Sequence, residues 1–408
     1  MIKFNTHSST AALFAFSIFA SPFSGAMIDP QDGYLDMGDY LANNAYGFLP
    51  VPIVITEPAI GVGGGMLGMF LHESDEERAK RKQHALTSLD GGAQLLAPAI
   101  TVAGGAYTDN GTWMALIGHR HTWNEDSIRY IGGAGYGHAN IDVYKRFQGE
   151  GLPGFIEPYS GTLGAGTESE GFLMKQRVSF RIPNSDLFLG VSQTYSSFST
   201  AIDSLSLAVN DQNFDFSNLG AKFDSSLSAL GVVAEYDTRN NLFFPTQGSS
   251  VVAEYLVYDS ALGSDFDYAT FEVDAYQYLP VNKHLTLAFA GSYSSLNTDE
   301  SYLPPLARPY INMRGVAAYK YQGDEVSTLQ AQAMWHLNHR WTINAFYGVG
   351  STAEEHSELF EDTVDAYGVG FRYQIARRYG IHVGVDVASV RIKAQLTSKL
   401  VRGSKRWT

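Results

Sequence analysis

Alternation of apolar and polar residues along unusually long runs is the feature that most constrains the fold of this chain. In the run 341–349, the odd positions carry Trp, Ile, Ala, Tyr and Val, and the even positions carry Thr, Asn, Phe and Gly. Period-two alternation is typical of a β-strand with two different faces. Such runs are about ten to fifteen residues long, whereas strands of soluble sheets average ~5–6 residues and tilted membrane strands need ~9–11. The pattern therefore predicts an all-β protein.

The composition supplies much apolar surface but no helix to carry it across a bilayer. The chain is 45% hydrophobic and 13% aromatic, yet no segment after the N-terminus reaches the ~18 consecutive apolar residues of a membrane helix. A large soluble β protein and a closed membrane barrel both fit these facts, because both pair the backbone polar groups of their strands. The length of the runs favours the transmembrane barrel.

The number of alternating runs predicts the size of the barrel. Fifteen runs occur, and their short and long connections alternate, as expected for periplasmic turns and extracellular loops. Barrels of this kind close with an even number of strands, so we predict a sixteenth, for which His84–Leu95 offers the room. The long connections include 139–167, 199–225 and 297–326. The fifteen runs are 59–73, 98–107, 111–123, 127–138, 168–181, 184–198, 226–237, 247–258, 264–279, 283–296, 327–337, 340–350, 364–375, 379–389 and 397–407.

Residues 1–26 have the features of a cleaved secretory signal peptide. Lys3 precedes a short apolar core, and small residues stand before the predicted cleavage after Ala26. The core is too short to span a bilayer as a helix. Residues 27–58 are then predicted to be a short periplasmic N-terminal segment, and residues 59–408 the transmembrane β-barrel.

Several classes of chemistry find no support in the sequence. The absence of cysteine excludes disulfides and thiolate metal sites, and the histidines are scattered, so no metal site is predicted. A formal charge of −14 without a basic stripe argues against nucleic-acid binding. No G-x-S-x-G elbow, phosphate loop or dinucleotide fingerprint occurs. We therefore predict no catalytic residues and no cofactor.

Two motifs, in this order, carry a family resemblance. The first is YDTRNNLFFPTQG at 236–248, and the second is MRG at 313–315. With them, residues from about 49 to the C-terminus resemble the BamA/TamA-type surface-antigen barrels, which insert or move other proteins at the bacterial outer membrane. The resemblance is to a branch that lacks periplasmic receptor (POTRA) domains.

The resemblance implies that 236–248 forms a periplasmic turn. Pro245 and Gly248 can shape such a turn, while Asp237 and Arg239 can pair with each other or bind backbone groups. We expect these four residues to have a structural role.

The second motif implies a lid inside the barrel. Met313, Arg314 and Gly315 match a motif that the family carries on a long extracellular loop folded into the lumen, where the arginine docks on the inner wall. The connection 297–326 occupies the corresponding place, and glycine beside the arginine allows a tight turn at the loop tip.

The expected docking wall departs from the family pattern. The family's F-x-D-x-G is matched by Phe346, Gly348 and Gly350, so the aspartate is missing, and Gln332 stands where a charged E-x-R usually begins. By alternation, three lumen-facing side chains can still accept a hydrogen bond from the arginine: Asp386, Gln332 and Gln330. Two arrangements stay open, namely a lid that docks differently and an arginine that faces water in a wide lumen.

Charged residues predict a polar lumen. Opposed basic and acidic walls can set up a transverse field, or they can pair with the folded-in loop. The inward-facing charges are Lys175, Arg177 and Arg181 on one wall, and Glu235, Glu254, Glu272 and Asp274 on another.

The resemblance implies protein insertion, translocation or lipid-related transport. Its partners would be outer-membrane lipids and nascent outer-membrane or secreted polypeptides, and its location the outer membrane of a Gram-negative bacterium. A seam between the first and last strands would offer unpaired backbone groups to an incoming strand. The glycines expected to weaken that seam are Gly61, Gly63 and Gly65.

Two alternatives belong to other functional classes. A passive diffusion channel can use the same barrel without moving any polypeptide. A surface adhesin can use the barrel as an anchor and act through the connections 139–167 and 199–225.

Overall fold

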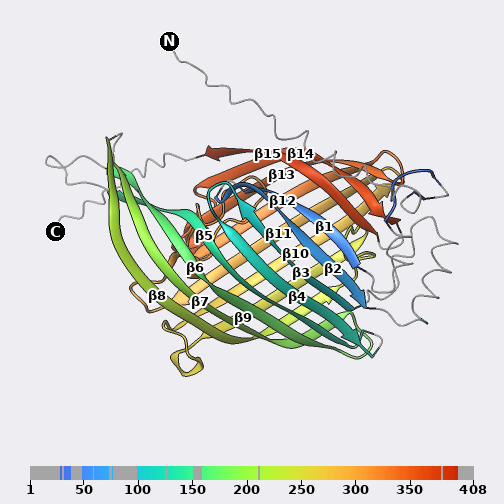
Figure 1. The fold of residues 1–408 in the computed structure, drawn as a ribbon, viewed down its shortest axis with the longest axis horizontal. Coiled ribbons are helices and arrows are strands. Elements are labelled where there is room, and N and C mark those ends of the chain that lie inside the picture. The colour runs from blue at the N-terminus through green and yellow to red at the C-terminus, as the bar shows by residue number, and fades with distance from the viewer. Residues whose placement is uncertain are drawn as a thin grey trace, which may run out of the picture.

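The chain forms one antiparallel sheet that curves into a barrel. This computed structural model describes residues 28–29, 32–37, 48–57, 59–72, 76, 99–124, 126–149, 159–209, 212–377 and 380–393. The fifteen strands of this part of the chain lie in sequence order, each paired with the next. They are β1 (Phe48–Glu57), β2 (Gly61–His72), β3 (Ala99–Thr108), β4 (Trp113–Trp123), β5 (Ile128–Gly149), β6 (Tyr159–Arg181), β7 (Leu187–Val209), β8 (Gln212–Asp237), β9 (Gly248–Tyr258), β10 (Tyr268–Asn282), β11 (Leu285–Thr298), β12 (Glu325–His336), β13 (Trp341–Ala353), β14 (Thr363–Ala376) and β15 (Ile381–Lys393), shown in Figure 1.

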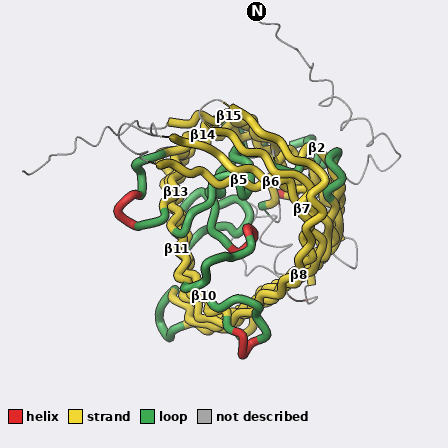
Figure 2. Tube along the Cα trace, turned by 90° about the vertical axis from the view of Figure 1, so that its left-hand side faces the viewer, coloured by secondary structure: helices red, strands yellow, loops and turns green. Residues whose placement is uncertain are grey.

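The strands surround a lumen, which confirms the predicted antiparallel barrel. Figure 2 shows them as a ring with loop segments inside it. At one end of the ring, Met37 and Ile381 of β15 belong to one apolar cluster, and Val51 of β1 packs against it. The first and last described strands therefore come together there. Within the described residues, no helix is long and apolar enough to cross a membrane.

The alternation in the sequence separates an outer from an inner face. On β13, Trp341, Ile343 and Tyr347 are 37%, 48% and 49% exposed, whereas Thr342 and Asn344 are buried. An outer surface with large, exposed apolar side chains is what contact with lipid requires. The inner face is left to carry polar groups and to contact whatever fills the lumen.

The barrel begins earlier in the chain than predicted. β1 lies within 27–58, the segment expected to precede the barrel, and pairs with β2 along its whole length. Pro50 and Pro52 hide this strand in the sequence, because proline cannot donate to a ladder. At the edge of a sheet, however, proline is tolerated, and β1 is one edge of the sheet formed by the described strands.

Three predicted segments lie outside the described residues: the signal peptide 1–26, the sixteenth strand at 84–95 and the final strand at 397–407. The register bears on the second of them. β2 pairs directly with β3, with Leu67 opposite Gly104. No strand therefore lies between these two in the sheet, and β1, which was not predicted, adds a strand before β2.

Two predicted loops are instead long strands. β5 to β8 have 22, 23, 23 and 26 residues, and they extend through most of 139–167 and 199–225. In Figure 1 these four strands reach past the others. Pairing continues in the extensions, with Tyr144 opposite Gly164 and Leu205 opposite Phe216. The extension of β7 and β8 does alternate, with Leu205 opposite Phe216 and Leu207 opposite Phe214, but this signal was not recognised as a continuation of the strands.

The glycines expected at a seam lie inside the sheet. Gly61, Gly63 and Gly65 are in β2, which pairs with β1 on one side and β3 on the other. They allow close strand approach, because a Cβ on Gly63 or Gly65 would lie 2.2 Å from a carbonyl oxygen of β3. Gly61 also has a φ of +83°, which disfavours other residues. The seam prediction was wrong because β1 was not recognised as a strand.

The close contact at Gly65 gives a test of this register. We expect Gly65→Ala to destabilise the barrel by about 1–3 kcal/mol, as forced overpacking usually does, measured by urea unfolding of the refolded protein. Gly64→Ala is the matched control, because its Cβ would meet nothing nearer than the Ile53 carbonyl oxygen at 3.3 Å. Equal losses for the two variants would contradict the register.

Candidate functional site

The connection between β11 and β12, residues 299–324, folds into the barrel and is called the lid here. Its side chains Ile311, Met313 and Val316 are 1%, 5% and 3% exposed. They form one cluster with Val326 of β12 and with Val364 and Ala366 of β14. The lid therefore packs on the inner wall as a protein core does, with little room for water between them.

Arg314 docks on Asp386 of β15. Its Nη1 donates to Asp386 Oδ2 at 3.1 Å, and its guanidinium carbon lies 3.7 Å from the ring centroid of Phe346. Asp386 also accepts two 2.7 Å hydrogen bonds from Arg372 and one of 3.0 Å from Asn344. Of the two arrangements left open by the sequence, the structure has a docked arginine, with its carboxylate on a different strand from the family's usual position.

The glutamines considered as acceptors lie on the same wall. Gln330 and Gln332 are on the inward-facing side of β12, where Gln332 is opposite Phe346 and Gln330 is opposite Gly348. Among the described residues, Arg314 donates to neither of them and bonds to Asp386.

Glycines in the wall make room for the lid. A Cβ on Gly348 would lie 3.2 Å from Met313 Sδ, and one on Gly350 would lie 2.8 Å from Ile311 Cγ2. At the lid tip, Gly315 has a φ of +84°, and a Cβ there would lie 2.6 Å from Ala388 Cβ. Glycine at position 348 thus replaces an ionic contact of the family pattern with apolar packing against Met313.

Further contacts hold the lid at its base and across the lumen. Arg308 forms an ion pair with Asp324, the last residue of the lid, and so ties the first half of the lid to its end. On the opposite side, the backbone N–H of Ala318 donates to Glu57 Oε1 of β1 at 3.0 Å. The lid consequently bridges from β12–β15 to the first strand.

The motif at 236–248 forms the turn between β8 and β9. Arg239 makes a two-pronged ion pair with Asp237, at 2.9 and 2.8 Å, and this hydrogen bonding raises the pKa of Arg239 despite its partial burial. Asn240 Oδ1 accepts from the backbone N–H groups of Thr246 and Gln247 on either side of the bend that follows Pro245. Gly248, at a φ of +99°, would carry a Cβ only 2.2 Å from the Thr238 carbonyl oxygen.

This turn reaches across the lumen to the far wall. The ring of Phe244 stacks on that of His382 of β15, with centroids 3.8 Å apart. A Cβ on Gly380 would lie 2.0 Å from Asn241 Nδ2, which shows how closely the turn approaches the end of β15. The turn thus narrows the lumen at the opposite end from the lid.

The inward-facing charges largely neutralise one another within the wall. Lys175 pairs with Glu254, and Glu235 accepts from Arg129 at 2.6 Å and lies 3.5 Å from Arg177. The guanidinium of Arg129 also stacks on Phe188, which is fully buried. These pairs reach from β5 and β6 to β8 and β9, two or three strands away, so the basic and acidic residues bind each other across the inner surface rather than setting up two opposed fields.

A feature not foreseen from the sequence anchors the N-terminal segment. Arg340, in the turn between β12 and β13, is 0% exposed and contacts three carboxylates: Asp29 at 2.7 Å, Asp32 at 2.6 Å and Asp36 at 2.5 Å. Arg377, after β14, lies 2.9 Å from Asp29. A buried arginine with one carboxylate on each nitrogen is held in a fixed position. Residues 28–29 and 32–37 are thereby clasped to the turns at the same end as the β8–β9 turn.

The electrostatics of the clasp favour its charged form. Burial disfavours a charged Asp32, but hydrogen bonds from Arg340, from the Tyr34 backbone N–H and from His339 outweigh it, so the pKa of Asp32 is lowered. Burial likewise opposes the charge on Arg340, whereas bonds to Asp32 and Asp36 raise its pKa. The spacing of the aspartates gave no signal, because their common partner lies about 300 residues away in sequence.

The ion pairs of Arg340 predict that replacing Arg340 and replacing its neighbour His339 will have different effects on protease resistance. Arg340→Ala leaves three carboxylates without their cation, so we expect it to release residues 28–37 at a cost of about 3–5 kcal/mol, detected by limited proteolysis. His339→Ala is the control, because the His339 side chain is 47% exposed and, within the described part of the chain, its ion-pair partner is Asp32 alone. Equal protease resistance of Arg340→Ala and the unmodified protein would contradict the anchoring role.

The described residues contain no group of three or more His, Cys, Asp or Glu side chains arranged to hold a metal ion. These residues form a lumen that is narrowed at both ends. The lid narrows one end and the β8–β9 turn narrows the other, and ion pairs and packing attach both segments to the wall.

Comparison with known proteins agrees with this architecture. The model of the Omp85 superfamily domain matches residues 159–312. BamA from Haemophilus ducreyi, lacking POTRA domains 1-3, superposes with a TM-score of 0.50 at 10% sequence identity, covering 85% of this chain and 66% of that one. CdiB from Acinetobacter baumannii gives a TM-score of 0.43 at 10% identity, covering 84% and 59%. This chain therefore spans about two thirds of the BamA chain and less of the CdiB chain.

No curated protein matches the chain in sequence. The family resemblance read from the two motifs is nevertheless confirmed by the domain match and the barrel fold. Residues 159–312 therefore match an Omp85 superfamily domain, within a chain that has an antiparallel β-barrel fold similar to that of BamA.

Proposed function

We propose that this protein, exported by a cleaved signal peptide to the outer membrane of a Gram-negative bacterium, inserts or translocates polypeptides there. The observation that carries the proposal is the lid, docked through Arg314 on Asp386 and packed on the wall through Ile311 and Met313. A lumen obstructed in this way is poorly suited to free diffusion. The edge of the sheet is then the place where a client strand can be received.

The first strand has the properties of an edge that opens. β1 carries Pro50 and Pro52, and edge strands tolerate proline where its nitrogen points away from the neighbouring strand. The two prolines would remove two hydrogen-bond donors from the side of β1 that faces the last strand. A pairing with fewer bonds is easier to exchange for a pairing with an incoming strand, as in strand addition to other sheet edges.

The mechanism is physical and needs no bond chemistry. A client strand pairs with the exposed backbone of β1, its apolar side chains turn toward lipid, and the barrel edge serves as a template. The contact between Ala318 of the lid and Glu57 of β1 supports a link between the position of the lid and the geometry of this edge.

A second function, surface adhesion, is favoured by one specific observation. The extensions of β5 to β8 form a ribbon that reaches past the other strands (Figure 1), and Phe214 and Phe216 on it are 47% and 54% exposed. Exposed aromatic side chains are common in contact surfaces. In that case, shortening the ribbon would abolish binding to cells while leaving the barrel folded.

Lid docking is tested by single-channel conductance in a planar bilayer. We expect the unmodified protein to be nearly silent, and Arg314→Ala to open more often, because a charge-assisted hydrogen bond of about 1–2 kcal/mol corresponds to a roughly 5- to 30-fold change in population. Arg308→Ala is the matched control, since it removes an arginine–aspartate pair at the lid base without touching the docking wall. Steady conductance of the unmodified protein would support a passive channel instead.

The edge mechanism is tested by the folding rate of a client barrel into liposomes that contain this protein. We expect Pro50→Val combined with Pro52→Val to slow client folding several-fold, because the restored N–H groups would strengthen the pairing of β1. Val54→Ile is the control, since Val54 lies on the same face and is 67% exposed, and the change leaves the donor count unaltered. Client folding that is unaffected by the proline replacements, or no faster than in empty liposomes, would overturn the mechanism.

A further inference from the structure

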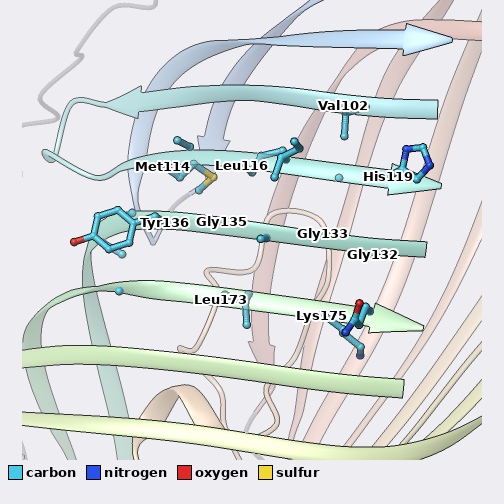
Figure 3. A pocket seen from close by; sticks show the side chains of 18 of the residues that line it. Val102, Met114, Leu116, His119, Gly132, Gly133, Gly135, Tyr136, Leu173 and Lys175 are labelled. Atoms are coloured by element: carbon cyan, nitrogen blue, oxygen red, sulfur yellow. The ribbon is translucent and has the colours of Figure 1, made fainter. Parts of the chain in front are cut away.

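One stretch of the inner wall is apolar and lines a partly open cavity of about 860 Å³. Figure 3 shows its wall, with Met114 and Leu116 on β4, Gly133 and Gly135 on β5, and Leu173 on β6. The volume is within the ~300–1,000 Å³ typical of small-molecule sites. This apolar stretch adjoins the ion-paired residues Lys175 and Arg177, and it corrects the expectation of a polar lumen.

Strand register explains why the cavity exists. Leu116 of β4 lies opposite Gly135 of β5, which in turn lies opposite Leu173 of β6, so these three positions share the inward face. The inward positions of β5 on either side are Gly133 and Gly137. A row of glycines where side chains would otherwise fill the space leaves a groove bordered by leucines.

The apolar side chains of this wall are accessible although they face inward. Leu173, Ile131 and Met114 are 49%, 44% and 39% exposed, values comparable with residues on the lipid-facing surface such as Leu189 at 48%. Exposed apolar surface of this extent is unfavourable in contact with water. An apolar occupant would relieve that cost.

The cavity is bounded above and below by the two inward-folded segments. Leu306 and Tyr319 of the lid border it, and so do Leu242 and Phe243 of the β8–β9 turn. A ligand there would be enclosed by the same elements that narrow the lumen. Its release would therefore depend on their movement.

Positive charge lies toward the end of the cavity near the β4–β5 turn. Arg120 lines the cavity, and its Nη1 is buried without a hydrogen-bond partner among the described residues. Lys175 and Arg177 also line it, but each already has a carboxylate partner in Glu254 and Glu235. A buried guanidinium nitrogen without an acceptor is costly, so Arg120 has an unused capacity for an anionic group.

We propose that this cavity binds a single-chain anionic amphiphile, with its hydrocarbon chain along the glycine row of β5 and its headgroup on Arg120. A polypeptide strand fits less well, because its backbone would need hydrogen-bond partners, whereas the wall's own backbone groups are already paired in the sheet. A free fatty acid and a lysophospholipid share the required chemistry. The proposal is independent of the insertion function, and its test reads binding rather than activity.

The test is photolabelling of the purified full-length chain, held in an amphipathic polymer, with a diazirine analogue of palmitate. We expect the label on peptides of β4 to β6, and competition by saturated fatty acids that strengthens about fourfold per added methylene until the cavity is filled. Leu173→Trp should fill the cavity and reduce this labelling at least tenfold. Leu189→Trp is the matched control, being equally exposed but on the outer face, and it should leave the labelling unchanged.

The variant Arg120→Leu tests the contact between the headgroup and Arg120 separately. This test remains valid even if Leu173→Trp does not fold. We expect this variant to weaken competition by palmitate about tenfold and to leave competition by 1-hexadecanol unchanged. Stronger competition by a lysophospholipid of the same chain length than by palmitate would identify a phosphate rather than a carboxylate head.

Three results would overturn the proposal. They are labelling confined to outward-facing residues, unchanged labelling in a folded Leu173→Trp variant, and equal effects of Arg120→Leu on palmitate and on the alcohol. None of these readouts depends on client folding, so failure of the ligand site and failure of the insertion function can be told apart.

Discussion

The requirement that every backbone polar group inside a bilayer be paired determines most of this structure. A sheet meets that requirement only by curving until its edges approach each other, and a ring of this many strands leaves a lumen too wide for wall side chains to fill. Segments of the chain itself occupy part of this wide lumen. The lid enters from one end, and the β8–β9 turn and residues 28–37 lie at the other.

Each of these segments is held by an arginine in a different setting. Arg314 crosses from the lid to Asp386, Arg239 braces the turn internally, and Arg340 is enclosed by three aspartates. The guanidinium group suits this role because it is planar, always charged and able to bond in several directions at once. Apolar packing completes the contact at the lid, where wall glycines accept Met313 and Ile311.

The sequence predicted the features that repeat or that local chemistry defines. Alternation marked fourteen of the fifteen described strands, and two motifs led to the turn and to the lid that docks through Arg314. It failed where the signal is weak or non-local. β1 was missed because of Pro50 and Pro52, and the extensions of β5 to β8 were taken for loops although 204–209 and 213–216 alternate.

Contacts between distant segments had little or no local signal. The three aspartates that clasp Arg340 lie about 300 positions from it, so no local pattern predicts this contact. For Arg314, alternation offered Asp386 as one of three acceptors but could not choose among them. The apolar wall behind the glycines of β5 also appears only once the register is known. Alternation alone cannot tell an inward-facing leucine from a lipid-facing one.

The central claim, that the lid is docked on the inner wall rather than loose in the lumen, can be tested directly by cysteine labelling, since the chain has no cysteine of its own. Ala366 is 2% exposed beneath the lid, whereas Ser301 at the start of the lid is exposed. With a water-soluble maleimide, a docked lid predicts slow labelling of Ala366→Cys and rapid labelling of Ser301→Cys in the native barrel. Comparable rates at the two positions would contradict it.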